Sequence, residues 1–478
     1  MIFVYLCGVI NQLKRFEMKK LFLLSAILIA VIVSSCSSGD YKSYVPADSK
    51  VVAKLDLATF FSQTGVDQEK LFKALGDQFG DDFKDVKDLG IDFASPMYIF
   101  ARQNGANIEV GAVAKIQDRA QFEKTFESKT GEKLSKAQDY SFVADDGVSA
   151  AVNDEVLVFV SSADLGSGKV DKGIIERVMS KKIEGDLSDN KVFAKVDGSN
   201  SFASFCADMS IIPESQIPVE AGISQTDIKQ IRSMIIDIDA SAKDGVCDFM
   251  CNATSTDKEM LARIEKSEKS VGFISEKALS SFSASDPFGF ATNIDGSALK
   301  DILNEFFSKG ASLIPGGANA DPETQKQISD MVNKASDILS KIKGNVLCAM
   351  HSPNDFVFLA EGKNITNDVV GIMQDTGMPP STLMKTDNGY NMQDQFMFGY
   401  QDNYFYVTTN PEATAQPAKA MGSPAPAALT SLMKDRKFVA FGNVEAIMQI
   451  INQAGGASDT KAFSEIFNKI KYVTYSYK

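Results

Sequence analysis

Histidine occurs once in the 478 residues, at His351, and tryptophan does not occur at all. A single histidine excludes a multi-histidine metal centre, and it makes His351 the sole candidate base for a Ser-His or Cys-His pair. Because His351 lies beside a Pro turn without a nucleophile motif, we predict a solvated turn residue rather than a base. The lack of tryptophan argues against a glycan-binding protein, since sugar platforms usually use large flat aromatic rings.

The motifs of common enzymes are also missing. GxSxG, HExxH, Walker A and GxGxxG do not occur, and the acidic clusters lack the ligand spacing of an EF-hand loop. We therefore predict no catalytic residue, no cofactor and no metal ligand, and we favour a protein that is not an enzyme.

Cysteine is scarce, which excludes a disulfide scaffold. Cys247 and Cys251 lie four residues apart in an expected strand, which places both on one face but about 13 Å apart, too far to bond with each other. A buried apolar role is the expectation for each cysteine of the folded body, and their pairing stays open. These cysteines are Cys206, Cys247, Cys251 and Cys348.

The longest apolar run is short and lies near the N-terminus. Residues 21–33 follow two lysines, which is typical of a secretory signal rather than a membrane span. The run ends in Val-Ser-Ser-Cys36, which resembles the lipobox of bacterial lipoproteins, where a cysteine is acylated before cleavage. The resemblance implies that residues 1–35 are an upstream extension and signal peptide. It also implies that Cys36 carries acyl chains such as palmitate, and that residues 36–43 form a tether.

Acidic residues outnumber basic ones. Removal of residues 1–35 takes four basic residues and one acidic residue from totals of 49 and 62, so the net charge changes from −13 to −16. Nucleic acids and anionic headgroups bind basic surfaces, so we predict no nucleic-acid partner.

One pattern occurs four times: a β-prone run that ends in an acidic or amide residue, followed by a segment that can start a helix. The terminal residues are predicted helix N-caps, because Asp and Asn accept hydrogen bonds from free backbone N–H groups. They are Asp56, Asp197, Asp295 and Asn443, within residues 49–61, 190–202, 287–303 and 436–451.

The segments between these units correspond as well. Strand, strand, helix and three further strands are expected over residues 97–162, and the same order over 345–410. We therefore predict an α+β fold with antiparallel sheets in two diverged tandem halves, residues 44–265 and 275–478. Helices are expected over 68–79, 260–279 and 324–342.

Tyrosines alternate along two of the expected strands, as on a half-exposed face. This set is a candidate binding face on one side of a sheet, and it comprises Tyr400, Tyr404, Tyr406, Tyr472, Tyr475 and Tyr477.

The lipobox, the opening YVPADSKVVAKLDL at 44–57, the tandem units and the length together resemble an uncharacterised lipoprotein family of Bacteroides-type gut bacteria. That family is a domain of unknown function, so the resemblance brings no catalytic residues. It implies an envelope lipoprotein, and Ser37 is similar to outer-membrane sorting. The periplasmic side and the cell surface both stay open.

Three functions are compatible with these features. The first is a non-enzymatic binding or scaffold protein, held to the membrane by Cys36 and contacting an envelope protein. The second is a carboxylate-dependent hydrolase with a site between the halves. The third is an envelope chaperone or inhibitor that pairs with exposed strands.

Overall fold

The structure is a computed structural model of the chain. It describes residues 40–478 except 80–88, 106, 146–147, 165–172, 182–184, 215–223, 301–321, 353, 376–377, 394, 420–422 and 454–463. The predicted signal peptide and Cys36 lie outside the described residues.

The predicted α+β class is confirmed, and the chain divides into two compact units. The first runs to Phe205 and includes α16 (Ser464–Lys469); the second runs from Cys206 and includes the final strand, β20 (Tyr472–Tyr477). β8 (Ala203–Asp208) spans this boundary. The division does not coincide with the halves 44–265 and 275–478, which stay a prediction about the sequence.

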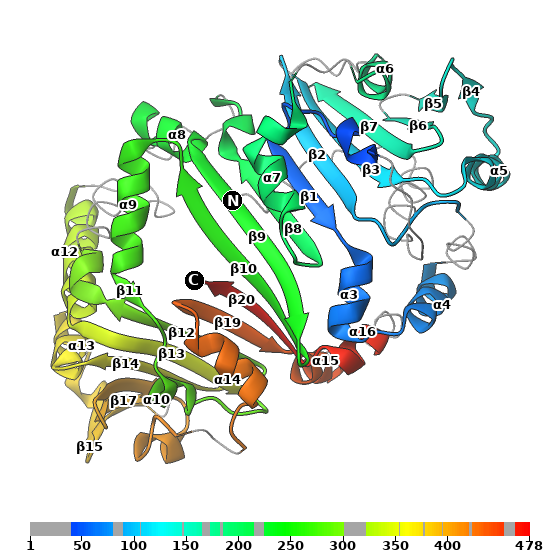
Figure 1. Cartoon of the computed structure of the whole chain (residues 1–478). Helices are drawn as coiled ribbons and strands as arrows, with labels where there is room; N and C mark the ends of the chain where they lie inside the picture. The colour runs from blue at the N-terminus through cyan, green and yellow to red at the C-terminus, as the bar shows by residue number, and fades with distance from the viewer. Residues whose placement is uncertain are drawn as a thin grey trace. The chain divides into compact units, whose positions relative to one another are not determined.

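The first unit contains an antiparallel sheet in the order β1–β2–β3–β7–β6–β5–β4 (Figure 1). Successive strands along the chain mostly pair with each other, as short connections favour. The strands are β1 (Val51–Leu55), β2 (Met97–Asn104), β3 (Asn107–Lys115), β4 (Ser135–Lys136), β5 (Ser141–Asp145), β6 (Val148–Val152) and β7 (Val156–Asp164).

Helices cover both faces of this sheet. On one face Leu71 of α4 (Gln68–Phe79) and Phe122 of α5 (Arg119–Thr130) join a buried core, against which α3 (Leu57–Thr64) also packs. On the other face the ring of Tyr98 lies against Tyr41 and Phe193. These two rings come from η1 (Tyr41–Tyr44) and α7 (Lys191–Asp197), and α6 (Ile174–Met179) packs on β7 beside them. The first unit thus has three layers.

The second unit contains a longer sheet in the order β9–β10–β20–β19–β12–β13–β14–β18–β17–β16–β15. The β10–β20 pair is parallel, and the other pairs of this order are antiparallel. The strands are β9 (Met234–Lys243), β10 (Val246–Ser255), β12 (Phe288–Asp295), β13 (Ile342–Ser352), β14 (Asp355–Gly362), β15 (Leu383–Thr386), β16 (Gly389–Met392), β17 (Phe396–Gln401), β18 (Tyr404–Thr408) and β19 (Phe438–Asn443).

Both units share one order of strand pairing. β12–β13–β14–β18–β17–β16–β15 repeats the order β1–β2–β3–β7–β6–β5–β4, strand for strand along the chain. α12 (Pro322–Ser340) and α13 (Ile365–Asp375) occupy the same places in the order as α4 and α5. The sequence predicted these corresponding strands and helices except β4 and β15, which lie outside the predicted strand segments.

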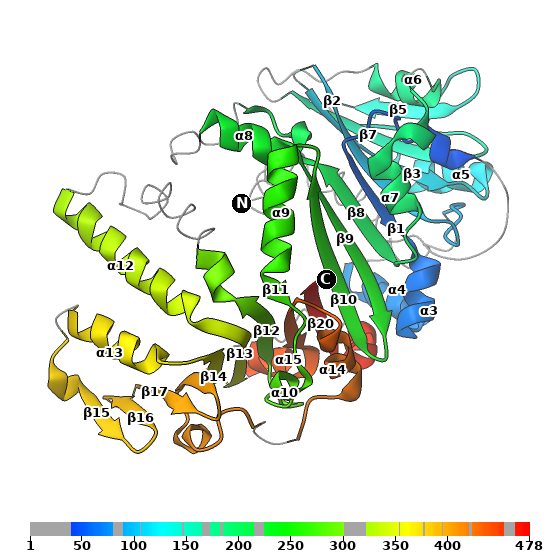
Figure 2. The same ribbon diagram turned by 60° about the vertical axis from the view of Figure 1, so that its left-hand side comes forward.

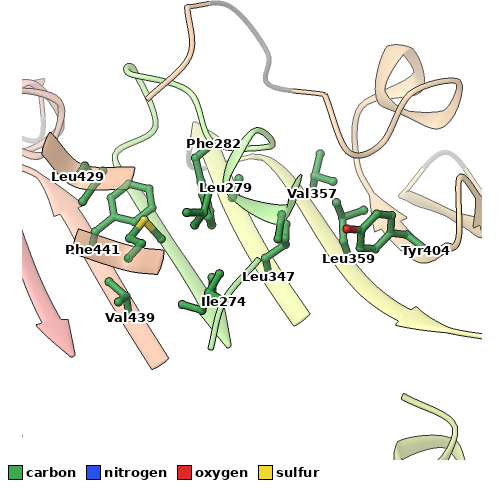
Figure 3. Close-up of a cluster of buried hydrophobic side chains, with 14 of the residues drawn as sticks. Ile274, Leu279, Phe282, Leu347, Val357, Leu359, Tyr404, Leu429, Val439 and Phe441 are labelled. Carbon is green, nitrogen blue, oxygen red and sulfur yellow. The ribbon is translucent and has the colours of Figure 1, made fainter. Parts of the chain in front are cut away.

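Helices also cover both faces of the second sheet. One face carries a core of aromatic and branched side chains beneath α10 (Glu276–Leu279) and α14 (Ala427–Lys434), with Phe282 edge-on to Phe441 (Figure 3). The opposite face packs against α12 and α13, which lie side by side (Figures 1 and 2). Burial of such side chains stabilises each by about 1.5–3 kcal/mol.

Three of the four predicted N-caps accept the expected backbone hydrogen bonds. Asp56 accepts one from Thr59 at α3, Asn443 from Ala446 at α15 (Val444–Gln453), and Asp295 from Ser297. The prediction for Asp197 is wrong, because this residue ends α7 and Asn190 caps that helix. Three apolar residues at helical spacing, Val192, Phe193 and Val196, are buried there, so the segment forms a helix rather than a strand.

The predicted helix over 260–279 is also interrupted. It consists of α9 (Lys258–Lys269), the short strand β11 (Val271–Gly272) and α10. β11 pairs with the end of β12, so sheet formation outweighs helix propensity at this point. α8 (Gln225–Arg232) precedes β9 and begins with a capping box at Ser224.

Candidate functional site

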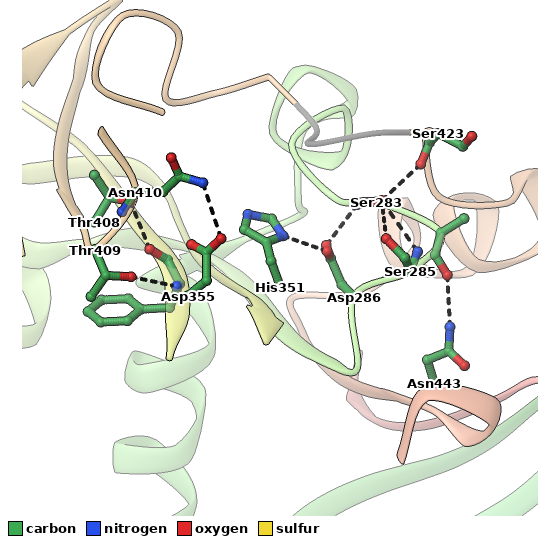
Figure 4. Close-up of polar contacts among 12 residues, drawn as sticks. Ser283, Ser285, Asp286, His351, Asp355, Thr408, Thr409, Asn410, Ser423 and Asn443 are labelled. Carbon is green, nitrogen blue, oxygen red and sulfur yellow. Dashed lines mark hydrogen bonds and ion pairs between the residues drawn. The ribbon is translucent and has the colours of Figure 1, made fainter. Parts of the chain in front are cut away.

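His351, the single histidine, is at the end of β13 and is not solvated. Its side chain is only 11% exposed, and Nδ1 lies 2.6 Å from Oδ1 of the fully buried Asp286 (Figure 4). The prediction of a solvated turn residue is therefore wrong. Two hydrogen bonds hold the segment before β12 near the end of β13. The Ser283 N–H donates to Asp286, and the Asn443 amide donates to the Ala284 carbonyl.

A second carboxylate lies near this pair. Asp355, at the start of β14, accepts a hydrogen bond from Asn410 through Oδ2, whereas its buried Oδ1 has no hydrogen-bond partner. The hydrogen bond that His351 donates to Asp286 raises the pKa of His351, burial opposes this, and the negative charges of Asp286 and Asp355 raise it further. The imidazolium is thus favoured at this position.

The geometry does not form a catalytic triad. Among the described residues the ring hydrogen-bonds with Asp286 alone, and the Ser283 hydroxyl bonds instead with Ser285 and the Ser423 carbonyl. A nucleophile needs the base within hydrogen-bond reach. His351 and Asp286 form an ion pair that ties β13 to the segment preceding β12.

The ion pair predicts a pH-dependent stability. Because folding raises the pKa of His351 above its ordinary value of 6.5, the pair stabilises the protein fully below about pH 6.5. This contribution is lost as the pH rises through the higher folded pKa. Urea unfolding followed by circular dichroism at about pH 6 and pH 8.5 measures the loss. The His351→Gln variant should lack this part of the pH dependence, and an equal dependence in both proteins would contradict the assignment.

A second candidate is a set of exposed apolar side chains on the sheet of the second unit, which we call the apolar strip. It consists of Phe249 of β10, Val473 and Tyr475 of β20, and Phe288 of β12, each 37–47% exposed. Phe249 is paired with Tyr475, while Val473 and Phe288 are both paired with Gly442. Directly paired residues share a face, so all four side chains point to the same side.

Among the described residues, helices cover this sheet face on both sides of the apolar strip and leave the strip itself exposed. On one side Phe290 packs into the core beneath α12 and α13 and stacks on Phe438, which lies edge-on to Tyr475. At the other end the Tyr477 hydroxyl donates to Glu268 of α9, which lies alongside β10 in Figures 1 and 2. The four exposed residues lie between these covered regions.

Two tyrosines of the candidate binding face are exposed. Tyr475 lies on the apolar strip and Tyr400 is also exposed, but Tyr404, Tyr406 and Tyr472 are buried in the core under α10 and α14. The prediction that these tyrosines share one face is wrong on β20, where Tyr472 and Tyr475 are three residues apart and point to opposite faces. Periodicity alone did not reveal that helices cover the face on which Tyr404 lies.

The four cysteines of the folded body are free thiols. Cys206 and Cys247 are buried as predicted, and Cys251 and Cys348 are half-buried. Burial raises the pKa of the Cys247 thiol to about 11 and also raises the pKa of Cys348, which makes both poor nucleophiles.

The described residues contain neither a metal-site candidate nor a membrane-spanning helix. No group of three or more His, Cys, Asp or Glu side chains there could hold a metal ion. None of the helices in the described part is both long and apolar enough to cross a membrane.

Comparison with known proteins identifies a family. Residues 41–477 match the family described as Domain of unknown function (DUF4836). No curated protein matches the chain. Two solved structures are distantly similar. Crystal form III of TP0453 has a TM-score of 0.27 and 9% identity over 44% of this chain and 76% of that chain. Crystal form I of TP0453 has a TM-score of 0.27 and 10% identity over 50% of this chain and 89% of that chain.

Proposed function

The chain belongs to the DUF4836 family, and from this premise we propose that it is a non-catalytic binding protein of a Bacteroides-type cell envelope. Acyl chains on Cys36 anchor it to the outer membrane, and the apolar strip binds an envelope protein. The exposure of Phe249, Phe288, Val473 and Tyr475 on one sheet face is the observation that supports this function best.

The size and composition of the apolar strip favour a protein partner. Four such side chains at this exposure present on the order of 300 Å² of apolar surface, which is at the lower end of the range for the largest apolar patch on a typical monomer, a patch that is often functional. Tyr and Phe are enriched at protein interfaces, where a few aromatic anchors supply most of the binding energy. Exposed Phe249 and Tyr475 are adjacent on paired strands, as such anchors commonly are.

Two other features of the fold bear on the proposal. The shared order of strand pairing is what an ancestral duplication would leave, which supports the two predicted tandem halves. The strands β4 and β15, each paired with one strand among the described residues, are two and four residues long. Short edge strands resist pairing with other chains, so capture of extended peptides there is disfavoured.

Site-specific photocrosslinking in intact cells tests the proposed interface. A benzophenone amino acid placed at Phe249 or at Tyr475 should capture the same envelope protein. The matched control is Met384 of β15, an exposed apolar residue of the same unit, and it should not capture that protein. Purified partner should then bind the wild-type chain at least tenfold more tightly than the Phe249→Ser, Tyr475→Ser double variant, since two interface anchors are removed.

Other outcomes would overturn parts of the proposal. Crosslinks to a second copy of the chain alone, or to lipid alone, would refute the proposed envelope-protein partner. Equal capture of the protein from Met384 would show that the apolar strip is not the binding surface. Metabolic labelling with palmitate tests the anchor separately, because the Cys36→Ser variant should lose the label.

A further inference from the structure

We infer that the membrane surface contacts the η1 side of the first unit, where the mixed charges around η1 meet zwitterionic phospholipid headgroups. This inference rests on the proposed acylation of Cys36. It adds an orientation to the anchor: α6, α7 and η1 face the bilayer, whereas α5 on the opposite sheet face points away from it.

The covalent distance is short. Five residue steps separate Cys36 from Tyr41, the first residue of η1, and even a fully extended chain spans at most about 18 Å over five residues. The acylated end of that segment is in the bilayer, so η1 must lie within this distance of the headgroups. The folded body therefore begins closer to Cys36 than the predicted tether of residues 36–43 implies.

η1 cannot easily detach to lengthen the tether. Tyr41, Tyr44 and Val45 are 4%, 7% and 1% exposed. The Tyr41 hydroxyl donates to the Pro96 carbonyl at 2.6 Å, and the Asn153 amide donates to the Tyr44 hydroxyl at 2.9 Å. Exposure of two buried tyrosines and one valine would cost several kcal/mol, at about 1.5–3 kcal/mol for a large apolar side chain.

The surface beside η1 carries both signs of charge. Lys42 pairs with Asp197 at 2.7 Å while both stay about one third exposed, and the Lys181 ammonium lies 4.4 Å from the centre of the Tyr44 ring. Exposed lysines and aspartates of the neighbouring segment add to this pattern, namely Lys191, Lys195, Asp186 and Asp189. Lysines can donate to headgroup phosphates and aspartates can accept from headgroup ammonium groups, which fits a zwitterionic lipid.

The lack of tryptophan in the chain permits a direct test. The acylated protein is reconstituted in phosphatidylethanolamine and phosphatidylcholine vesicles that carry a nitroxide quencher on the headgroup. A Ser43→Trp variant places the fluorophore in η1, and a Ser128→Trp variant places it on the exposed side of α5. We expect at least a twofold loss of emission for Ser43→Trp and no loss for Ser128→Trp, because the sheet and helix layers, each about 10 Å thick, separate α5 from η1.

The controls separate the two proposals. Failure of the wild-type chain to float with the vesicles would refute the anchor itself. Flotation with no quenching of Ser43→Trp, or with stronger quenching of Ser128→Trp, would refute the orientation and leave the anchor intact. If Ser43→Trp does not fold, Ser180→Trp, exposed at the end of α6 beside Lys181, replaces it.

Discussion

Replacement of Asp286 by alanine is expected to lower the free energy of unfolding by about 3–5 kcal/mol, because it leaves one partner of a buried ion pair without compensation. The carboxylate is fully buried and bonds with both His351 and the Ser283 N–H. Its loss leaves the buried Ser283 N–H without this acceptor and the His351 ring, itself only 11% exposed, without its ion-pair partner. Urea unfolding followed by far-ultraviolet circular dichroism at about pH 6 measures the change.

A matched surface pair provides the control. Glu276 of the same unit lies 3.7 Å from Lys434 but is 83% exposed, and Glu276→Ala should change the unfolding free energy by less than about 1 kcal/mol. Equal losses for Asp286→Ala and Glu276→Ala would contradict the importance of burial. A double-mutant cycle with Asp286→Asn and His351→Gln should give a non-additive result, since the two side chains are in direct contact.

Local features of the fold could be predicted from the sequence. The helix at 68–79 and the strands that correspond to 97–162 and 345–410 were predicted because periodicity, turn residues and caps act over short distances. His351 was misread because its partner is distant in sequence: it pairs with Asp286, 65 positions away. Asp197 was misread for a local reason, because the β-prone residues before it form the helix α7, which Asp197 ends.

The candidate binding surface could not be predicted for a similar reason. The alternation of side chains along β20 shows which residues share a face, but it does not show which face the helices leave exposed. The apolar strip also depends on the parallel pairing of β10 with β20, which brings together Phe249 and Tyr475 from distant parts of the chain. The tyrosine pattern at Tyr472, Tyr475 and Tyr477 was the sequence signal for this surface. It identified Tyr475, which is one of the four residues of the apolar strip.

Glu109 of β3 is the second carboxylate whose removal should be severe. It is fully buried, and it faces two guanidinium groups, with Arg102 Nη1 3.1 Å from Oε2 and Arg177 Nη2 3.0 Å from Oε1. The Asn104 amide also donates to Oε1 at 2.8 Å. Glu109→Ala should lower the unfolding free energy by about 3–5 kcal/mol, because it leaves Arg102 buried with less negative charge to balance it.

Two comparisons isolate the effect of the charge at Glu109. Glu109→Gln keeps the shape and one carbonyl acceptor, so it should cost less than Glu109→Ala while still losing the ion pairs. Asp154→Ala removes a carboxylate that is 86% exposed and 3.4 Å from Arg119 in the same unit, and it should cost less than about 1 kcal/mol. Arg102 also bonds with Asp48, which is only partly buried, at 2.8 Å. If Asp48 alone balanced the charge of Arg102, Glu109→Ala would lower the unfolding free energy as little as Asp154→Ala does. Thermal or urea unfolding of the two variants measures both losses.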